Sequence, residues 1–63
     1  MFMLWNDEDS IPASRELFKT RADARAYARS FRRRFAQQGY YLTTDWRRVA
    51  PKDIQLTILT AEP

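Results

Sequence analysis

Apolar residues in the middle of the chain recur at the spacing of one helix face, i, i+3, i+4 and i+7. They are Ala24, Tyr27, Ala28, Phe31 and Phe35. Thr20 precedes them as a good N-cap residue, and Asp23 follows three positions later, where an acid suits the start of a helix. Gly39 comes after them and can adopt the left-handed conformation that commonly ends a helix. The pattern therefore predicts a helix over 20–38, with its two phenylalanines buried at the centre of the core.

Two short strands are expected before this helix. Residues 2–5 form an apolar run that is typical of a buried strand. The segment "NDEDSIPAS" that follows contains Asn, Asp, Ser and Pro, which favour a turn or loop. Residues 15–20 are the second strand candidate. They would pair with the first strand as a hairpin around Ile11 and Pro12.

After the helix, residues with a preference for strands predominate. Residues 40–44 read as a strand, and 45–49 continue it or follow a bend. Because successive side chains of a strand point to opposite faces, we expect one of Tyr40 and Tyr41 to be buried and the other exposed. A turn is expected around Pro51. In the closing segment "DIQLTIL", the apolar residues that alternate on one face are Ile54, Leu56 and Ile58.

The order strand, strand, helix, strand, strand predicts a single α+β domain over 1–63. One amphipathic helix would pack on one face of an antiparallel sheet of three or four strands, which buries both apolar stripes. The order of the strands within the sheet does not follow from the sequence.

Composition limits the ways in which such a small domain can be stabilised. A chain of 63 residues buries only about 60% of the surface that its unfolded form exposes. Because the chain has no cysteine and no histidine, disulfides and the usual transition-metal ligands are excluded. A homodimer is an alternative source of buried area. The absence of cysteine agrees with a cytoplasmic location, and no apolar run is long enough to predict insertion into a membrane.

The arginines of the predicted helix gather toward one side of it. At about 100° per residue, five of them lie between about 60° and 180° from Ala24. These five are Arg21, Arg25, Arg29, Arg32 and Arg33. Like charges at i, i+4 each cost about 0.2–0.5 kcal/mol, so a partner that benefits from them is worth considering. The planar, permanently charged guanidinium suits phosphate, and several together would give salt-dependent attachment to a nucleic-acid backbone.

Three interpretations of the arginine side remain open. The first is a solvated face, or one that is neutralised within the molecule by Asp7, Glu8 and Asp9, since the net charge is only +3. The second is a small basic binding module for nucleic acid. The third is a module that binds an acidic protein partner.

Two tryptophans add to these hypotheses. Packing in the core or on a sheet face is the favoured interpretation for both Trp5 and Trp46. The alternative is an aromatic anchor for a partner, because Trp and Arg are common at binding hot spots. Trp46 stands next to Arg47, and this pair would extend the binding surface of the helix arginines.

Catalysis is not expected. Nucleophilic catalysis usually requires a base such as histidine beside the nucleophile, and here the bases are carboxylates. A single glycine excludes a glycine-rich phosphate loop. The three adjacent acids at 7–9 have nothing nearby that completes an oxygen cage for a metal. We therefore expect a non-enzymatic domain without a cofactor.

Overall fold

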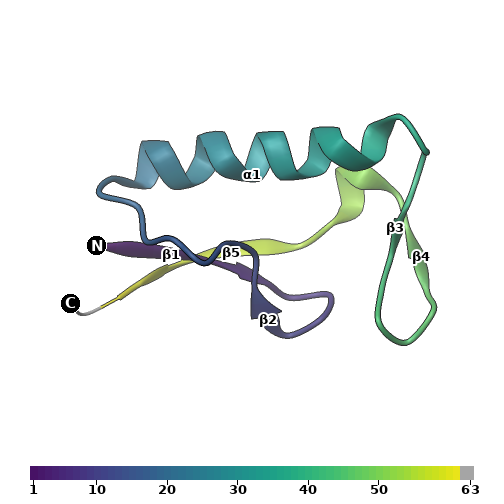
Figure 1. Ribbon diagram of the computed structural model, residues 1–63, viewed down its shortest axis with the longest axis horizontal. Coiled ribbons are helices and arrows are strands. Elements are labelled where there is room, and N and C mark those ends of the chain that lie inside the picture. Colours follow the sequence, from purple (N-terminus) through teal and green to yellow (C-terminus); the bar gives the residue numbers. More distant parts are fainter. Residues whose placement is uncertain (62–63) are drawn as a thin grey trace.

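The structure is a computed structural model that describes residues 1–61. Its elements, in chain order, are β1 (Phe2–Asn6), β2 (Ile11–Pro12), α1 (Arg21–Ala36), β3 (Tyr41–Leu42), β4 (Arg48–Val49), a short 3-10 turn η1 (Pro51–Asp53) and β5 (Leu56–Thr60). Strand β1 lies between β2 and β5 in an antiparallel sheet of three strands. Helix α1 covers one face of this sheet (Figure 1), which confirms the predicted α+β fold.

Strands β3 and β4 form a separate antiparallel hairpin of two strands. It begins just after the C-terminal end of α1 and extends past the level of the three-stranded sheet at one end of the molecule (Figure 1). The chain then passes through η1 and returns along β1 as β5. Strands on both sides of the helix are confirmed, but three strands rather than two follow the helix, and they divide between two sheets. The second strand, β2, lies at Ile11–Pro12, where the turn of the hairpin was expected.

Both ends of the helix follow the predicted signals. The hydroxyl of Thr20 accepts a hydrogen bond from the backbone N–H of Asp23 at 3.1 Å, as an N-cap does. Gly39 has a φ of 87°, and its N–H donates to the carbonyl of Phe35 at 2.9 Å. This left-handed glycine stops the helix and redirects the chain into the hairpin.

The prediction of a strand over 15–20 is wrong. The chain turns earlier, because the side-chain oxygen of Asn6 accepts the backbone N–H of Glu8 at 3.0 Å and closes a local turn. Ser10 adopts a left-handed φ of 55°, and β2 starts at the next residue. In the segment that was expected to be a strand, Phe18 makes only an isolated bridge to Phe2.

The core lies between the helix and the returning chain. Phe31, Tyr41 and Ile54 form its buried centre, and Leu4 is buried further along beneath α1. The burial of Phe31 is confirmed. Phe35 packs against the same cluster but is only half-buried, because it lies in the last turn of the helix, near the edge of the core.

Several other burial predictions can be compared with the structure. Tyr41 is buried and Tyr40 is half-buried, so the alternation was right but less sharp than expected. In the closing segment Ile54 is buried, while Leu56 and Ile58 are half-buried. The exposed fraction of Trp46 is 81%, so core packing was the wrong interpretation for it. Trp46 lies in the loop between β3 and β4, beyond the reach of the helix.

Candidate polyanion-binding surface on the helix

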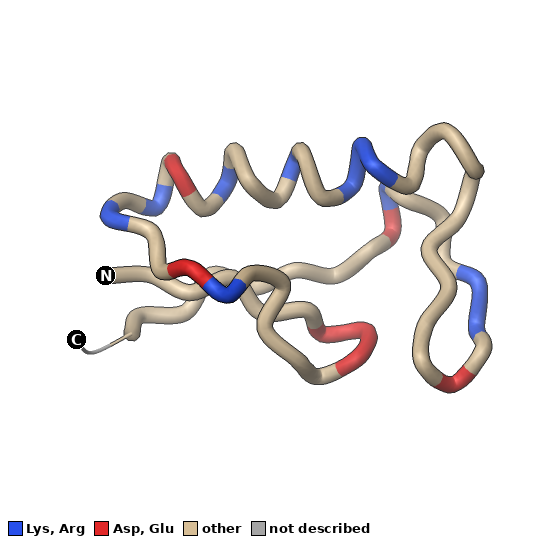
Figure 2. The backbone as a smooth tube through the Cα atoms, in the orientation of Figure 1, with Lys and Arg blue, Asp and Glu red and all other residues tan. Residues whose placement is uncertain are grey.

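Three arginines form a slanted row on the exposed side of α1. Arg25, Arg29 and Arg33 follow one another at intervals of four residues, and all three are exposed. None of them has a hydrogen-bond, ion-pair or aromatic partner among residues 1–61. We call these three residues the arginine row. We call Asp7, Glu8 and Asp9 the acidic turn. Figure 2 shows the basic positions along the helix, and the helix lies on the side of the molecule away from the acidic turn.

Two of the five predicted arginines are held against the protein instead. The Nε and Nη2 atoms of Arg32 donate to the carbonyl oxygen of Ile54 at 3.3 and 2.9 Å. The guanidinium of Arg21 lies 5.0 Å from the centre of the Phe2 ring, which is a cation–π contact. Arg32 therefore acts as a structural residue that ties the helix to the chain before β5. Arg21 remains exposed one helix turn before Arg25, the first member of the arginine row.

Arg34 lies on the other flank of the helix. Its Nη2 donates to the hydroxyl of Tyr27 at 3.1 Å, and its guanidinium lies over the rings of Tyr27 and Phe31. An open hollow of about 440 Å³ lies beside it. The lining residues are Ser30, Arg33, Arg34 and Gln37. Helical spacing places Ser30 and Gln37 on the same polar face, but no sequence signal marks them as site residues.

The acidic turn does not neutralise the arginine row. Asp9 accepts hydrogen bonds from the hydroxyl of Tyr41 and from the backbone N–H and hydroxyl of Thr44, the last two at 2.8 and 2.9 Å. Asp7 accepts from the hydroxyl of Thr57 at 2.5 Å. These bonds hold Asp9 against the β3–β4 hairpin and Asp7 against β5. Within residues 1–61, the ion pair is that of Asp45 with Arg47, and no acid bridges to a helix arginine.

These contacts change the titration of two groups. The backbone N–H of Thr44 and the hydroxyl of Tyr41 stabilise the charged carboxylate, so they hold the pKa of Asp9 below its usual range. Burial, together with the bond to Asp9, raises the pKa of Tyr41. The connection between the acidic turn and the hairpin thus consists of an ionised carboxylate and a neutral phenol at neutral pH.

The structure separates Trp46 and Arg47 from the helix arginines. Both residues lie in the β3–β4 hairpin, near its connecting loop, and the Nε of Arg47 is 3.1 Å from a carboxylate oxygen of Asp45. The Nη2 of Arg47 also reaches the carbonyl of Glu8 at 3.4 Å. The hydroxyl of Thr43 and then Arg47 hold the pKa of Asp45 below its usual range. The predicted site is therefore two surfaces, one basic on the helix and one of mixed charge around the loop of the hairpin (Figure 2).

Neither a metal site nor a membrane-spanning helix is found in the described part of the chain. No group of three acidic side chains among residues 1–61 is arranged to hold a metal ion. No helix in that range is long and apolar enough to cross a membrane. Comparison of the chain with protein-family models, with curated proteins and with solved structures finds no match.

Proposed function

We propose that this protein is a small basic binding module that attaches to a nucleic-acid backbone through α1. The observation that carries the proposal is the arginine row, whose three guanidinium groups are exposed, have no partner among residues 1–61 and stand at intervals of four residues. Bringing these like charges together costs free energy in the isolated protein. A phosphate backbone offsets that cost and accepts bidentate hydrogen bonds from each guanidinium.

The spacing of the row suits an extended polyanion. A helix rises about 1.5 Å per residue, so neighbouring members of the row lie about 6 Å apart along the axis and the whole row spans about 12 Å. Duplex DNA carries one phosphate per about 3.4 Å of axis on each strand. A row that lies parallel to the duplex axis would therefore meet about every second phosphate of one strand. Contacts of this kind give affinity without sequence preference.

A titration with oligonucleotides tests the proposal. A generic duplex and a generic single strand are titrated at about 50 and 200 mM salt. For three neutralised phosphates, log K should fall by about 2.7 per tenfold increase in salt on a duplex and by about 2.1 on a single strand. The double variant Arg25→Glu/Arg29→Glu should lose binding to both.

A matched control separates the row from net charge. The variant Arg48→Glu/Lys52→Glu has the same change in charge but leaves the helix intact, so it should keep most of the affinity. No binding at low salt, or equal losses in the two double variants, would refute the proposal. Binding of poly-glutamate with equal affinity would favour an acidic protein partner instead.

A further inference from the structure

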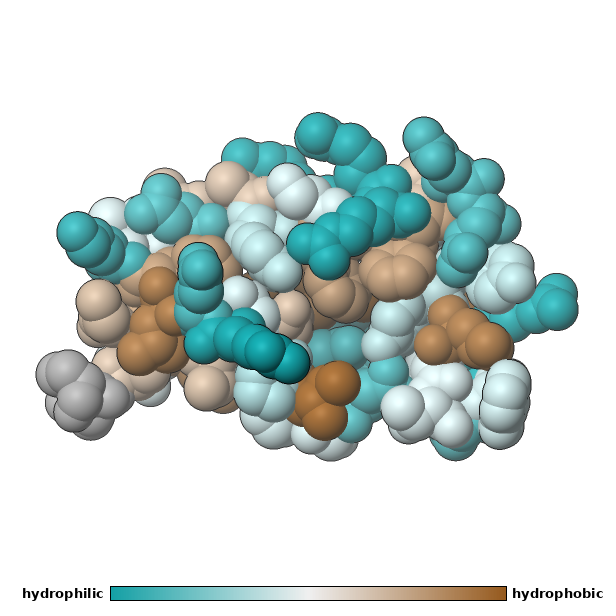
Figure 3. Space-filling view, viewed as in Figure 1, coloured by the Kyte–Doolittle hydropathy of each residue, from teal (hydrophilic) through white to brown (hydrophobic). Residues whose placement is uncertain are grey.

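The face of the sheet turned away from the helix carries unpartnered apolar side chains. Leu4 is buried beneath α1, so the alternation of β1 places its neighbours Met3 and Trp5 on the outer face. The register pairs Met3 with Leu59 and Trp5 with Pro12, which extends this face across all three strands. Figure 3 shows polar side chains along the helix and separate apolar patches, with polar side chains between them, at the level of the sheet. A layer that would cover the outer face is absent from residues 1–61.

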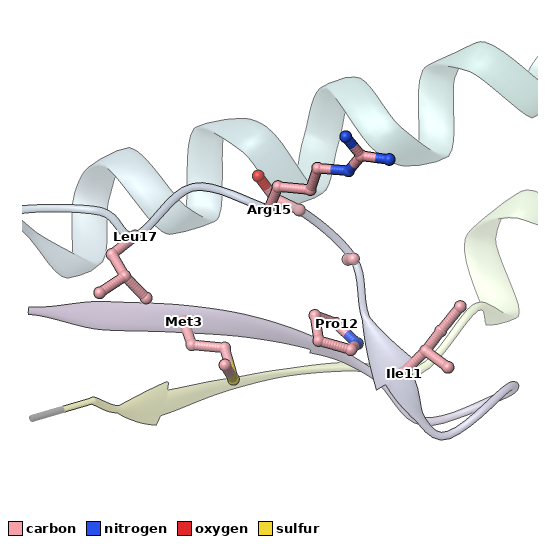
Figure 4. Close-up of a pocket in the computed structure, with 7 residues that line it drawn as sticks. Met3, Ile11, Pro12, Arg15 and Leu17 are labelled. Carbon is pink, nitrogen blue, oxygen red and sulfur yellow. The ribbon is translucent and has the colours of Figure 1, made fainter.

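A hollow of about 530 Å³ opens on this side of the molecule. Met3, Ile11, Pro12 and Leu17 supply its apolar lining. Arg15 also lines it, and Figure 4 shows the guanidinium of Arg15 directed toward α1, away from these side chains. We call it the outer groove. Ile11 and Leu17 are among the large apolar side chains that the monomer leaves exposed. The groove is thus an open apolar site, which suits an apolar anchor.

The same chain displays such an anchor. Trp46 is 81% exposed and has a left-handed φ of 68°, a conformation that is strained for a bulky residue. Its backbone N–H donates to the carbonyl of Thr43 at 3.0 Å, and Thr43 in turn pairs with Arg47 through both its backbone and its hydroxyl. The loop is therefore rigid, and it holds the indole in solvent. Asp45 stands directly before it, and its pairing with Arg47 and Thr43 helps to fix the loop.

We propose that a second copy of this chain occupies the outer groove, with Trp46 of each copy inserted into the groove of the other. Because this contact is made twice, the interface is a two-fold symmetric one. The arrangement requires no partner other than the protein itself.

The shape of the molecule permits this arrangement. The β3–β4 hairpin extends past the sheet at one end, and the outer face is open toward the other end (Figure 1). A half-turn about an axis along the line of sight therefore brings the hairpin of each copy against the outer face of its partner. Helix α1 stays on the outside of both copies. The dimer leaves the arginine row free, so this inference and the proposed function stand independently.

An interface of ordinary size would cover a modest share of this molecule. A stable interface of standard size buries about 800 Å² on each partner. The accessible surface is 4638 Å², so the dimer would cover about a sixth of it. Domains of about 60 residues have small cores, and association with a second copy is one way in which they gain buried area. The groove, the sheet face and the indole supply that area with apolar atoms.

Sedimentation equilibrium over about 1 μM to 1 mM protein tests the inference. The unmodified chain should be a reversible dimer. Trp46→Ala should raise the dissociation constant at least about 30-fold, as expected for a hot-spot residue. Leu42→Ala removes the other large exposed apolar side chain of the same hairpin and should leave the dissociation constant within about threefold.

Mixing two variants tests the reciprocal geometry. Leu17→Asp damages the groove but keeps the anchor, whereas Trp46→Ala keeps the groove. Each variant alone should be monomeric, and an equimolar mixture should recover part of the dimer, because one anchor meets one intact groove. Ile11→Asp should weaken the dimer as a second groove variant, should Leu17→Asp fail to fold by circular dichroism. A monomer at 1 mM, a dimer unaffected by Trp46→Ala, or no recovery on mixing would overturn the inference.

Discussion

The hydroxyl of Tyr41 donates a hydrogen bond to the carboxylate of Asp9. The two residues are 32 positions apart in the chain, and the bond connects the hairpins in which they lie. The same hydroxyl accepts from the side-chain amide of Asn6 at 2.9 Å. Asn6 is buried, and the structure leaves no buried side-chain polar atom of residues 1–61 without a partner. A fully bonded polar cluster of this kind holds the hairpin in one orientation.

Removal of the Asp9 carboxylate should loosen this connection. Asp9→Ala leaves the Tyr41 hydroxyl and two donors of Thr44 without their acceptor, and we expect a loss of about 1–3 kcal/mol in the free energy of unfolding. Chemical denaturation followed by circular dichroism measures it. Glu8→Ala is the matched control, because only the backbone of Glu8 makes contacts, and it should change stability by less than about 0.5 kcal/mol. Equal effects of the two variants would contradict the assignment.

The lowered pKa of Asp9 predicts a dependence of stability on acid. Since the folded-state pKa lies below the unfolded value of about 3.9, the contribution is complete above that value. It is lost as the pH falls through the folded-state pKa. Stability should therefore decline from about pH 4 downward, and Asp9→Asn should show a shallower decline. Parallel acid profiles for the two proteins would remove Asp9 as the source.

Arg32 and Arg29 should separate stability from binding. Arg32→Ala removes both hydrogen bonds to the carbonyl of Ile54, so we expect a loss of about 1–3 kcal/mol in the free energy of unfolding. Arg29→Ala should leave stability within about 0.5 kcal/mol and weaken the attachment to nucleic acid. Thermal melts and oligonucleotide titrations on the two variants check this. A destabilised Arg29→Ala would show that the row is structural.

Phe31 and Phe35 should differ in their importance to the core. Phe31→Ala should cost about 3–5 kcal/mol, because the ring is buried against Tyr41 and Ile54. Such a loss approaches the whole stability expected of a domain this size. Phe35→Ala should cost less, since its ring is half-buried. Urea denaturation of both variants ranks them, and the reverse order would place the centre of the core at the end of the helix.

The helix and the fold class could be predicted because their signals are local. Thr20, Asp23 and Gly39 act within one turn of chain, and the apolar stripe reports a face that any partner layer would bury. The strand over 15–20 was misplaced because the turn that decides the pairing depends on Asn6, a residue buried by distant contacts. Short segments rich in β-forming residues do not reveal which sheet they join.

The candidate site was predicted in part for the same reason. Helical spacing placed the row of Arg25, Arg29 and Arg33 correctly on an exposed side. It could not show that Arg32 reaches the carbonyl of Ile54, since that contact joins positions 22 residues apart. Nor could it show that Trp46 stands alone in solvent, because only the tertiary fold carries the hairpin away from the helix.

The separation of the helix arginines from the acidic turn gives the molecule an electric dipole. Cations lie along α1, while Asp7, Glu8 and Asp9 lie beyond the sheet (Figure 2). A charge distribution of this kind orients a protein before contact, because the field of a polyanion attracts one side and repels the other. The protein should therefore approach a polyanion with its helix facing the polyanion. Fewer encounters are then lost because the wrong side of the protein makes contact.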